Sequence, residues 1–279
     1  MQKIIVAAAS VKNEFGNTVK NVKGMIPWIE SAKSKGADLI LFPELNVTGY
    51  ICAPIAAEIA EPVPGPSTDR IISIAHEFNI LIAFGIIERK DRFLYCSQVL
   101  VNSEGIIGKQ RKIHVPAHEK PYWHAGDSIE VFDVGKVKVG ISICRDSFFD
   151  EYTRTLYFKG AELVLMPFTY YNVPRSDYLT GTIHGMSLQK ASWTNGYYSL
   201  CCNSAEGREP NQWEPKGRRF PGWAGLIGPW GNIISFVNEP GNNEALVVEV
   251  LNQDDVANRR NHPNFLAEEL RPELYAYKS

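Results

Sequence analysis

The sequence lacks any long apolar run. No segment of its 279 residues approaches the ~20 consecutive apolar positions that a helix needs to cross a bilayer. The first residues turn polar after one short strand-like stretch, so we expect neither a signal peptide nor a membrane partner. An excess of charge is missing too, since 29 basic and 31 acidic side chains leave a formal charge of -2. This balance argues against a nucleic-acid partner, because polyanions select strongly basic surfaces.

Cysteine is scarce and unevenly placed. The five cysteines include one adjacent pair and no Cys-x-x-Cys motif: Cys52, Cys96, Cys144, Cys201 and Cys202. An odd number at irregular spacing fits neither a disulfide framework nor a metal knuckle, so we expect a reducing, cytoplasmic location. No Walker loop or dinucleotide-binding glycine motif opens a helix after a strand. We therefore expect no cofactor.

The composition is that of a globular protein with a sizeable core. Hydrophobic residues make up 44% of the chain and charged residues 22%, which argues against a disordered or fibrous protein. The length would suit two average domains, but no internal repeat, low-complexity tract or long linker divides the chain. We expect one domain over residues 1–279, with a C-terminal tail from about residue 252.

The hydrophobic pattern alternates between buried strands, hairpins and amphipathic helices. Strands are expected at 3–9, 37–44, 80–88, 93–101, 105–113, 129–134, 136–144, 161–167 and 197–203, with a hairpin over 224–237. Helices are expected at 17–35, 68–78, 150–159 and 176–194, and a polar loop at 204–222. Mixed strand–helix units and hairpins predict an α/β fold, in which helices cover one sheet or two sheets packed face to face.

Three reactive side chains each follow a predicted strand: Glu44, Lys112 and Cys144. Ligands bind at the carboxyl ends of strands in α/β sheets, so distant residues can converge there on one site. A carboxylate can take a thiol proton, while an ammonium lowers the thiol pKa and stabilises an oxyanion. Taken singly, each has an ordinary explanation: an inert core cysteine, a capping or solvated glutamate, and a surface lysine beside Arg111. The coincidence of all three indicates a thiol hydrolase.

The segments around these residues resemble a known family. LILFPELNVTGY, GKQRKIHVP and GISICRDSFFDEYTRTLYFKGAELVLMP are similar to the blocks around the Glu, Lys and Cys of the nitrilase superfamily, the carbon-nitrogen hydrolases. The resemblance extends from residue 3 to about residue 250. It implies a four-layer αββα sandwich of two mixed β-sheets flanked by helices, and a metal-free mechanism with Glu44, Lys112 and Cys144 as the catalytic triad. It also implies a homodimer or larger homo-oligomer.

Family members usually carry a second glutamate between the lysine and the cysteine. Glu119 is the only acidic residue between Lys112 and Asp127, and the resemblance implies that it holds the lysine and orients substrate or water. A loop carboxylate paired with Lys120 is the alternative. His114 and His118 are four residues apart, but Pro116 between them argues against a helix that would present both to a metal.

The residues after the cysteine bear on the substrate. Arg145 stands where amidase-like members have an aromatic residue, and the Trp-Glu pair of true nitrilases is missing, so a small linear amide is favoured over a nitrile. The Arg145 backbone N–H is expected to bind an oxyanion. We expect the side chain of Arg145 or of Arg175 to bind a substrate carboxylate. The alternative is that these arginines only fix a loop. The alternatives are an N-carbamoyl amine or amino-acid amidohydrolase acting on a ureido substrate, and a catalytically silent binding protein.

Overall fold

Twelve strands form two six-stranded sheets in the computed structural model, which describes residues 3–170, 182–208, 218–238 and 244–275. The first sheet has the order β12-β1-β2-β3-β4-β5. Its strands are β1 (Ile4–Ser10), β2 (Leu39–Leu41), β3 (Leu81–Lys90), β4 (Phe93–Asn102), β5 (Gly105–Arg111) and β12 (Ala245–Leu251). The second sheet has the order β11-β10-β9-β8-β7-β6. Its strands are β6 (Val131–Asp133), β7 (Lys138–Ile141), β8 (Leu163–Phe168), β9 (Tyr198–Arg208), β10 (Arg218–Ile227) and β11 (Ile233–Val237).

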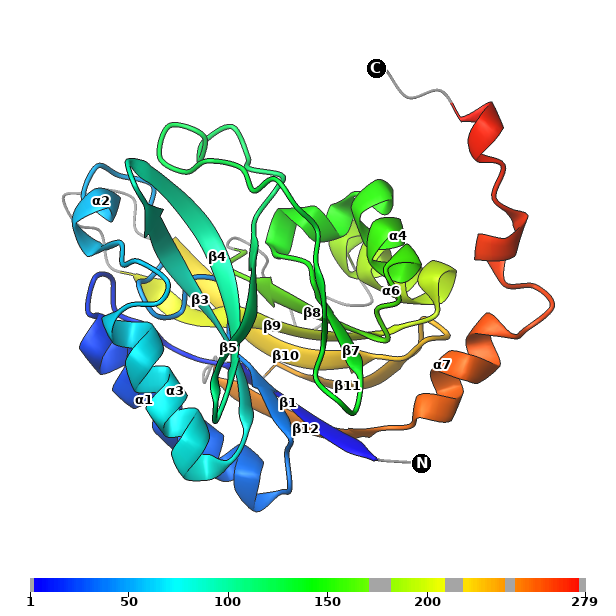
Figure 1. Cartoon of the computed structure of the whole chain (residues 1–279), viewed down its shortest axis with the longest axis horizontal. Coiled ribbons are helices and arrows are strands. Elements are labelled where there is room, and N and C mark those ends of the chain that lie inside the picture. Colours follow the sequence, from blue (N-terminus) through cyan, green and yellow to red (C-terminus); the bar gives the residue numbers. More distant parts are fainter. Residues whose placement is uncertain (1–2, 171–181, 209–217, 239–243, 276–279) are drawn as a thin grey trace.

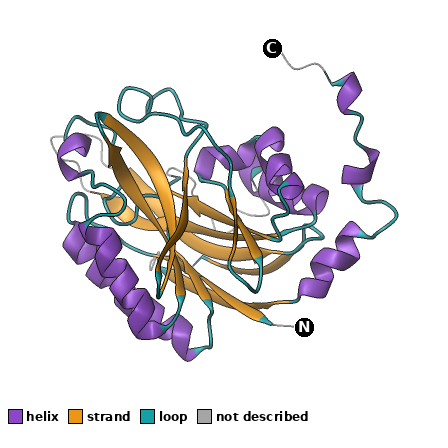
Figure 2. Cartoon of the chain, in the orientation of Figure 1, coloured by secondary structure: helices purple, strands orange, loops and turns teal. Residues whose placement is uncertain are grey.

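Helices cover the outer face of each sheet. The longer helices are α1 (Thr18–Ser34) and α3 (Pro66–Phe78) beside the first sheet, and α4 (Asp150–Phe158) and α6 (Ile183–Asn195) beside the second. Figure 1 places these two pairs on opposite sides of the strands, and Figure 2 shows the strands as the middle layers. Each sheet is mixed, since β1-β2-β3 and β7-β8-β9 are parallel and the remaining pairs are antiparallel. The predicted αββα sandwich is confirmed.

Strand β1 shows how the sequence builds these layers. Val6 and Ala8 belong to the core between the two sheets, while Ala7 and Ala9 pack into the second core beneath α1 and α3. Successive strand residues point to opposite faces, so a strand that is buried on both sides reads as a continuous apolar run. No helix among the described ranges is long and apolar enough to cross a membrane.

The polar loop predicted at 204–222 is wrong at both ends, while 209–217 lie outside the described residues. Residues 204–208 extend β9 to Arg208 and 218–222 start β10 at Arg218, and the two strands pair with Asn203 opposite Trp223. The polar composition hid the strands, because a polar residue such as Ser204 is buried here, with its hydroxyl 3.1 Å from that of Thr169. Backbone ladder bonds decide this region rather than local propensity.

The predicted tail begins with a short helix. In α7 (Gln253–Arg260), Val256 and Arg259 are buried, and the Arg259 guanidinium donates to the Trp193 carbonyl of α6 at 2.9 and 3.1 Å. Phe265 is buried as well, whereas no described residue after it is. In Figure 1 the last described segment extends away from the two sheets toward the C-terminus. The first part of the tail therefore packs on its own chain.

Candidate active site

Glu44 lies in a tight turn just after β2 and is 1% exposed. Leu45 has a φ of 54°, which turns the chain beneath β3. Gly85 of β3 makes room for that turn, because a Cβ atom there would lie 2.1 Å from the Leu45 backbone nitrogen. The Thr169 N–H, directly after β8, donates to Glu44 Oε2 at 2.9 Å. The second sheet thereby helps to fix the carboxylate that the first sheet delivers.

Lys112 follows β5 and is also 1% exposed. Its Nζ lies 2.8 Å from Glu44 Oε1 and 2.9 and 3.0 Å from the Glu119 carboxylate oxygens. Burial alone would lower the pKa of Lys112, but Glu44 and the other acidic groups around it raise it well above its usual value. The ammonium is therefore charged and bridges two carboxylates.

Glu119 sits in a turn that its own N–H closes on the Pro116 carbonyl at 2.9 Å. Its carboxylate binds Lys112 rather than pairing with Lys120, and the Tyr50 hydroxyl donates to it at 2.8 Å. Burial raises the pKa of Glu119 while Lys112 opposes that shift. Tyr50 also lies 2.9 Å from His118 Nε2, so the turn, the tyrosine and the lysine hold this carboxylate from three sides.

Cys144 marks the junction between β7 and the short 3-10 helix Cys144–Phe148. Its φ of 47° is unusual for a residue other than glycine, and such strained positions cluster at functional sites. Asp146, two residues later, is fully buried and accepts hydrogen bonds from the Ile113 and His114 backbones and from His114 Nδ1. This carboxylate connects the cysteine turn to the segment that carries Lys112.

The electrostatics around Cys144 differ from our expectation of a lowered thiol pKa. Burial raises the pKa of Cys144 well above its usual value, and Glu44 and Glu119 add to that shift while Lys112 opposes it. Burial is the largest of these influences, and the raised pKa keeps the resting thiol protonated. A base must therefore remove the proton when the sulfur reacts.

A cavity of about 480 Å³ opens beside the thiol. Its walls include Tyr50, Glu119, Cys144, Arg145, Phe148 and His184. The His184 ring stacks on Phe148, with 4.6 Å between the ring centroids. Burial lowers the pKa of His184, and the positive charge of the nearby Arg145 lowers it further. The cavity therefore presents a thiol, a carboxylate, an arginine and an aromatic wall to a small molecule.

Some of these contacts have no signal in the sequence. Thr169 lies two residues after the third block and His184 lies 17 residues after it, and nothing local marks either of them. Tyr50 closes the first block, yet only its hydrogen bond to Glu119 shows its place in the site. Arg175, proposed from sequence as a substrate-binding residue, lies outside the described residues.

The contacts of Glu119 lead to a measurable expectation. Glu119→Gln should lower kcat about 10- to 100-fold, because an amide keeps the shape but weakens the charged hydrogen bonds by roughly 1.5–3 kcal/mol. Alkylation of Cys144 should persist, since Glu44 remains to accept the thiol proton. Steady-state kinetics and peptide mapping measure both effects, with Lys120→Gln as the control on the same loop. Unchanged kcat in Glu119→Gln would contradict a positioning role.

Comparisons with known proteins identify the family of this chain. The carbon-nitrogen hydrolase family model matches residues 5–260. A nitrilase of Pyrococcus abyssi is 40% identical over 152 residues, which cover 53% of this chain and 58% of that protein. The N-carbamoylputrescine amidase of Solanum lycopersicum is 27% identical over 259 residues, covering 88% of this chain and 85% of that one.

Solved structures share the fold at low sequence identity. A carbon-nitrogen hydrolase from Helicobacter pylori G27 superimposes with a TM-score of 0.84 at 19% identity, covering 98% of this chain and 97% of the other. An amidase from Nesterenkonia sp. gives a TM-score of 0.77 at 20% identity, with 95% of each chain covered. The family match over most of the chain shows that this protein belongs to the carbon-nitrogen hydrolases of the nitrilase superfamily.

Proposed function

We propose that the protein hydrolyses the carbon-nitrogen bond of a small linear amide through a thioester on Cys144. The observation that carries the proposal is the cavity that exposes Cys144 and Glu119, with Lys112 ion-paired to Glu119 and Glu44 behind them. A nucleophile, a proton acceptor and a fixed cation within one buried network are the groups that acyl transfer needs. The products are a carboxylate and ammonia or an amine.

The first half-reaction forms the thioester. Glu44 takes the proton of Cys144 as the sulfur attacks the carbonyl carbon, and the Lys112 ammonium and the Arg145 N–H stabilise the oxyanion. The tetrahedral intermediate collapses, the carbon-nitrogen bond breaks, and Glu44 returns the proton to the leaving nitrogen. In the second half-reaction Glu44 takes a proton from water, whose oxygen attacks the thioester, and the thiol is regenerated as the acid leaves.

Arg145 favours substrates with an acidic end. Its side chain is exposed on the cavity wall, and no described carboxylate lies within ion-pair distance of it. The two nearest acids in sequence are engaged elsewhere, since Asp146 binds His114 and Asp150 binds Lys190. The guanidinium is therefore available to a ligand, and a bidentate contact with a carboxylate suits its geometry.

Arg145→Ala should raise KM at least about tenfold for carboxylate-bearing substrates and change it little for neutral amides of the same length. The backbone N–H survives this substitution, so kcat should stay close to that of the unchanged protein. Kinetics with matched acidic and neutral substrates measure the split. Equal losses for both classes would show that Arg145 only holds the loop, and Arg175→Ala then becomes the next variant to measure.

An N-carbamoyl amine or amino-acid amidohydrolase is the second candidate. The full-length similarity to N-carbamoylputrescine amidases favours it, and a ureido substrate presents the same carbonyl to Cys144. A panel of amides, ureido acids and nitriles, assayed for ammonia and carbon dioxide, separates the possibilities. Ammonia together with carbon dioxide identifies the ureido reaction, and turnover of nitriles alone contradicts an amidase. Tight binding without turnover identifies a silent binding protein.

We propose one domain that assembles as a homodimer or larger homo-oligomer in the cytoplasm. Exposed apolar side chains on α4 and α6 support assembly: Phe158, Ile183, Met186 and Trp193. Five free thiols suit a reducing compartment. Sedimentation of the whole chain measures the assembly.

A further inference from the structure

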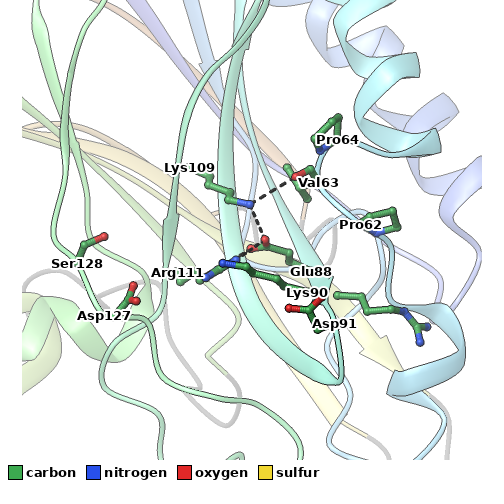
Figure 3. Close-up of a pocket in the computed structure, with 11 residues that line it drawn as sticks. Pro62, Val63, Pro64, Glu88, Lys90, Asp91, Lys109, Arg111, Asp127 and Ser128 are labelled. Carbon is green, nitrogen blue, oxygen red and sulfur yellow. Dashed lines mark hydrogen bonds and ion pairs between the residues drawn. The ribbon is translucent and has the colours of Figure 1, made fainter.

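A second cavity, of about 520 Å³, lies on the outer face of the first sheet. Strand alternation creates it, because Lys109 and Arg111 of β5 point to the face opposite Lys112. There they meet Glu88 of β3, which has the same orientation (Figure 3). We call this cavity the outer-face pocket. It is separated from Cys144 by the thickness of the sheet.

A buried carboxylate forms the floor of the outer-face pocket. Glu88 is 1% exposed and accepts hydrogen bonds from Arg111 Nε at 2.9 Å, Arg111 Nη2 at 2.6 Å and Ser97 Oγ at 2.7 Å. Lys109 forms an ion pair with the same carboxylate. Burial alone would raise the pKa of Glu88, but Arg111, Lys109 and Ser97 lower it to about 2. Glu88 is therefore ionised and fixes both cations in place.

The floor carries an excess of positive charge, since one carboxylate is shared by two cations. Arg111 is further oriented by Tyr95, whose ring centre lies 4.0 Å from the guanidinium carbon. An arginine has five N–H donors and a lysine three, so both retain donors beyond those that Glu88 and the Val63 carbonyl take. These fixed donors need no reorganisation to bind an anion.

The rim adds two more cations, Arg89 and Lys90, and two acids. Lys90 is the exposed last residue of β3 and, among the described residues, has no ion-pair partner, whereas the Arg89 guanidinium donates to the Ala60 carbonyl at 3.2 Å. Asp91 and Asp127 are exposed on the same rim, and Figure 3 shows Asp127 on the side of Arg111, with Asp91 beside Lys90 on the other side. Glu88 first, and Asp127 to a smaller extent, raise the pKa of Arg111. Solvent screens these rim acids more than it screens the half-buried floor. The charges of Asp91 and Asp127 disfavour a large polyanion that spans the rim more than a small anion on the floor.

We propose that the outer-face pocket binds a small oxyanion, the carboxylate or phosphate group of a metabolite, through Lys109, Arg111 and Lys90. Arg111 and Lys112 are consecutive residues. A ligand bound to Arg111 therefore contacts the end of β5, directly before the proposed catalytic lysine. The site is separate from the proposed amide cavity and does not depend on the proposed reaction.

Calorimetry of the full chain at low ionic strength tests this site, with inorganic phosphate and acetate as probes. Saturable binding of either probe is expected, and Lys90→Gln should weaken it at least about fivefold, the effect of one charged contact. Lys109→Gln should weaken it further, with thermal unfolding to verify that the Glu88 network still folds. Lys23→Gln, an exposed lysine on α1, is the matched control. Acetate binding points to a carboxylate ligand, and binding of phosphate alone points to a phosphorylated one.

Three outcomes would overturn the proposal. One is the absence of saturable binding of both probes to the unaltered protein. Another is equal affinity in Lys90→Gln, Lys109→Gln and Lys23→Gln. The last is loss of binding in Arg145→Ala with retention in the pocket variants, which would place the anion in the cavity beside Cys144 instead.

Discussion

Replacing Cys144 by alanine should abolish turnover and leave the fold intact. We expect a loss of at least about 10⁴-fold in kcat, because the nucleophile has no substitute in the cavity and covalent catalysis stops without it. The backbone strain at φ 47° is no greater for alanine than for cysteine, and the lost sulfur borders a cavity. Initial-rate assays measure the activity, and circular dichroism with thermal unfolding measures the fold.

Cys52→Ala is the matched control, since Cys52 is a cysteine whose side chain is only partly buried. It should retain activity. An alkylating amide should label Cys144 ahead of the remaining cysteines, because Cys96, Cys201 and Cys202 are at most 1% exposed. More than trace activity in Cys144→Ala would show that the nucleophile lies elsewhere.

Glu44→Gln should lower kcat about 10²- to 10⁴-fold, the usual contribution of a positioned general base. The expectation follows from the raised pKa of Cys144, which keeps the thiol protonated at neutral pH unless a neighbour accepts the proton. Glutamine has one acceptor oxygen, so it can keep only one of the two hydrogen bonds that Glu44 accepts from the Thr169 N–H and from Lys112. The Glu44 backbone carbonyl still accepts from the Thr169 hydroxyl, and thermal unfolding measures whether the turn is kept.

Alkylation kinetics separate this role from that of Glu119. In Glu44→Gln the labelling of Cys144 should slow at neutral pH, because the carboxylate that takes the thiol proton is gone, and it should recover at alkaline pH, because burial still raises the pKa of the thiol. In Glu119→Gln the labelling should stay close to that of the unchanged protein. Glu162→Gln, a glutamate remote from the cavity, is the control. If the Glu44→Gln variant kept the turnover and the labelling rate of the unchanged protein, Glu44 would be excluded as the proton acceptor.

The free-energy cost of burying charged side chains in this site supports a functional role for them. Glu44, Lys112 and Glu119 are buried within hydrogen-bond distance of one another. Taking three charges out of water is expensive, and apolar residues of similar volume are often as stable or more so. Stability alone therefore does not explain this arrangement, whereas proton transfer beside a buried thiol needs it.

The sequence by itself determined the layers and the family. Strand β3, expected at 80–88, spans Leu81–Lys90, and the helix expected at 68–78 spans Pro66–Phe78. These predictions succeed because hydrophobic periodicity and helix-ending residues are local signals. The three blocks that resemble the carbon-nitrogen hydrolases also stand in the sequence, and the family match over residues 5–260 confirms that resemblance.

Only the tertiary structure decided which groups meet and with what electrostatic effect. Lys112 and Arg111 are adjacent in sequence, yet strand alternation places Lys112 between Glu44 and Glu119 and Arg111 in the outer-face pocket. Thr169 reaches Glu44 across 125 positions of chain. The pKa of Cys144 rises rather than falls because burial and two carboxylates outweigh one ammonium. Desolvation and Coulomb interaction depend on depth and distance, which exist only after the two sheets have packed together.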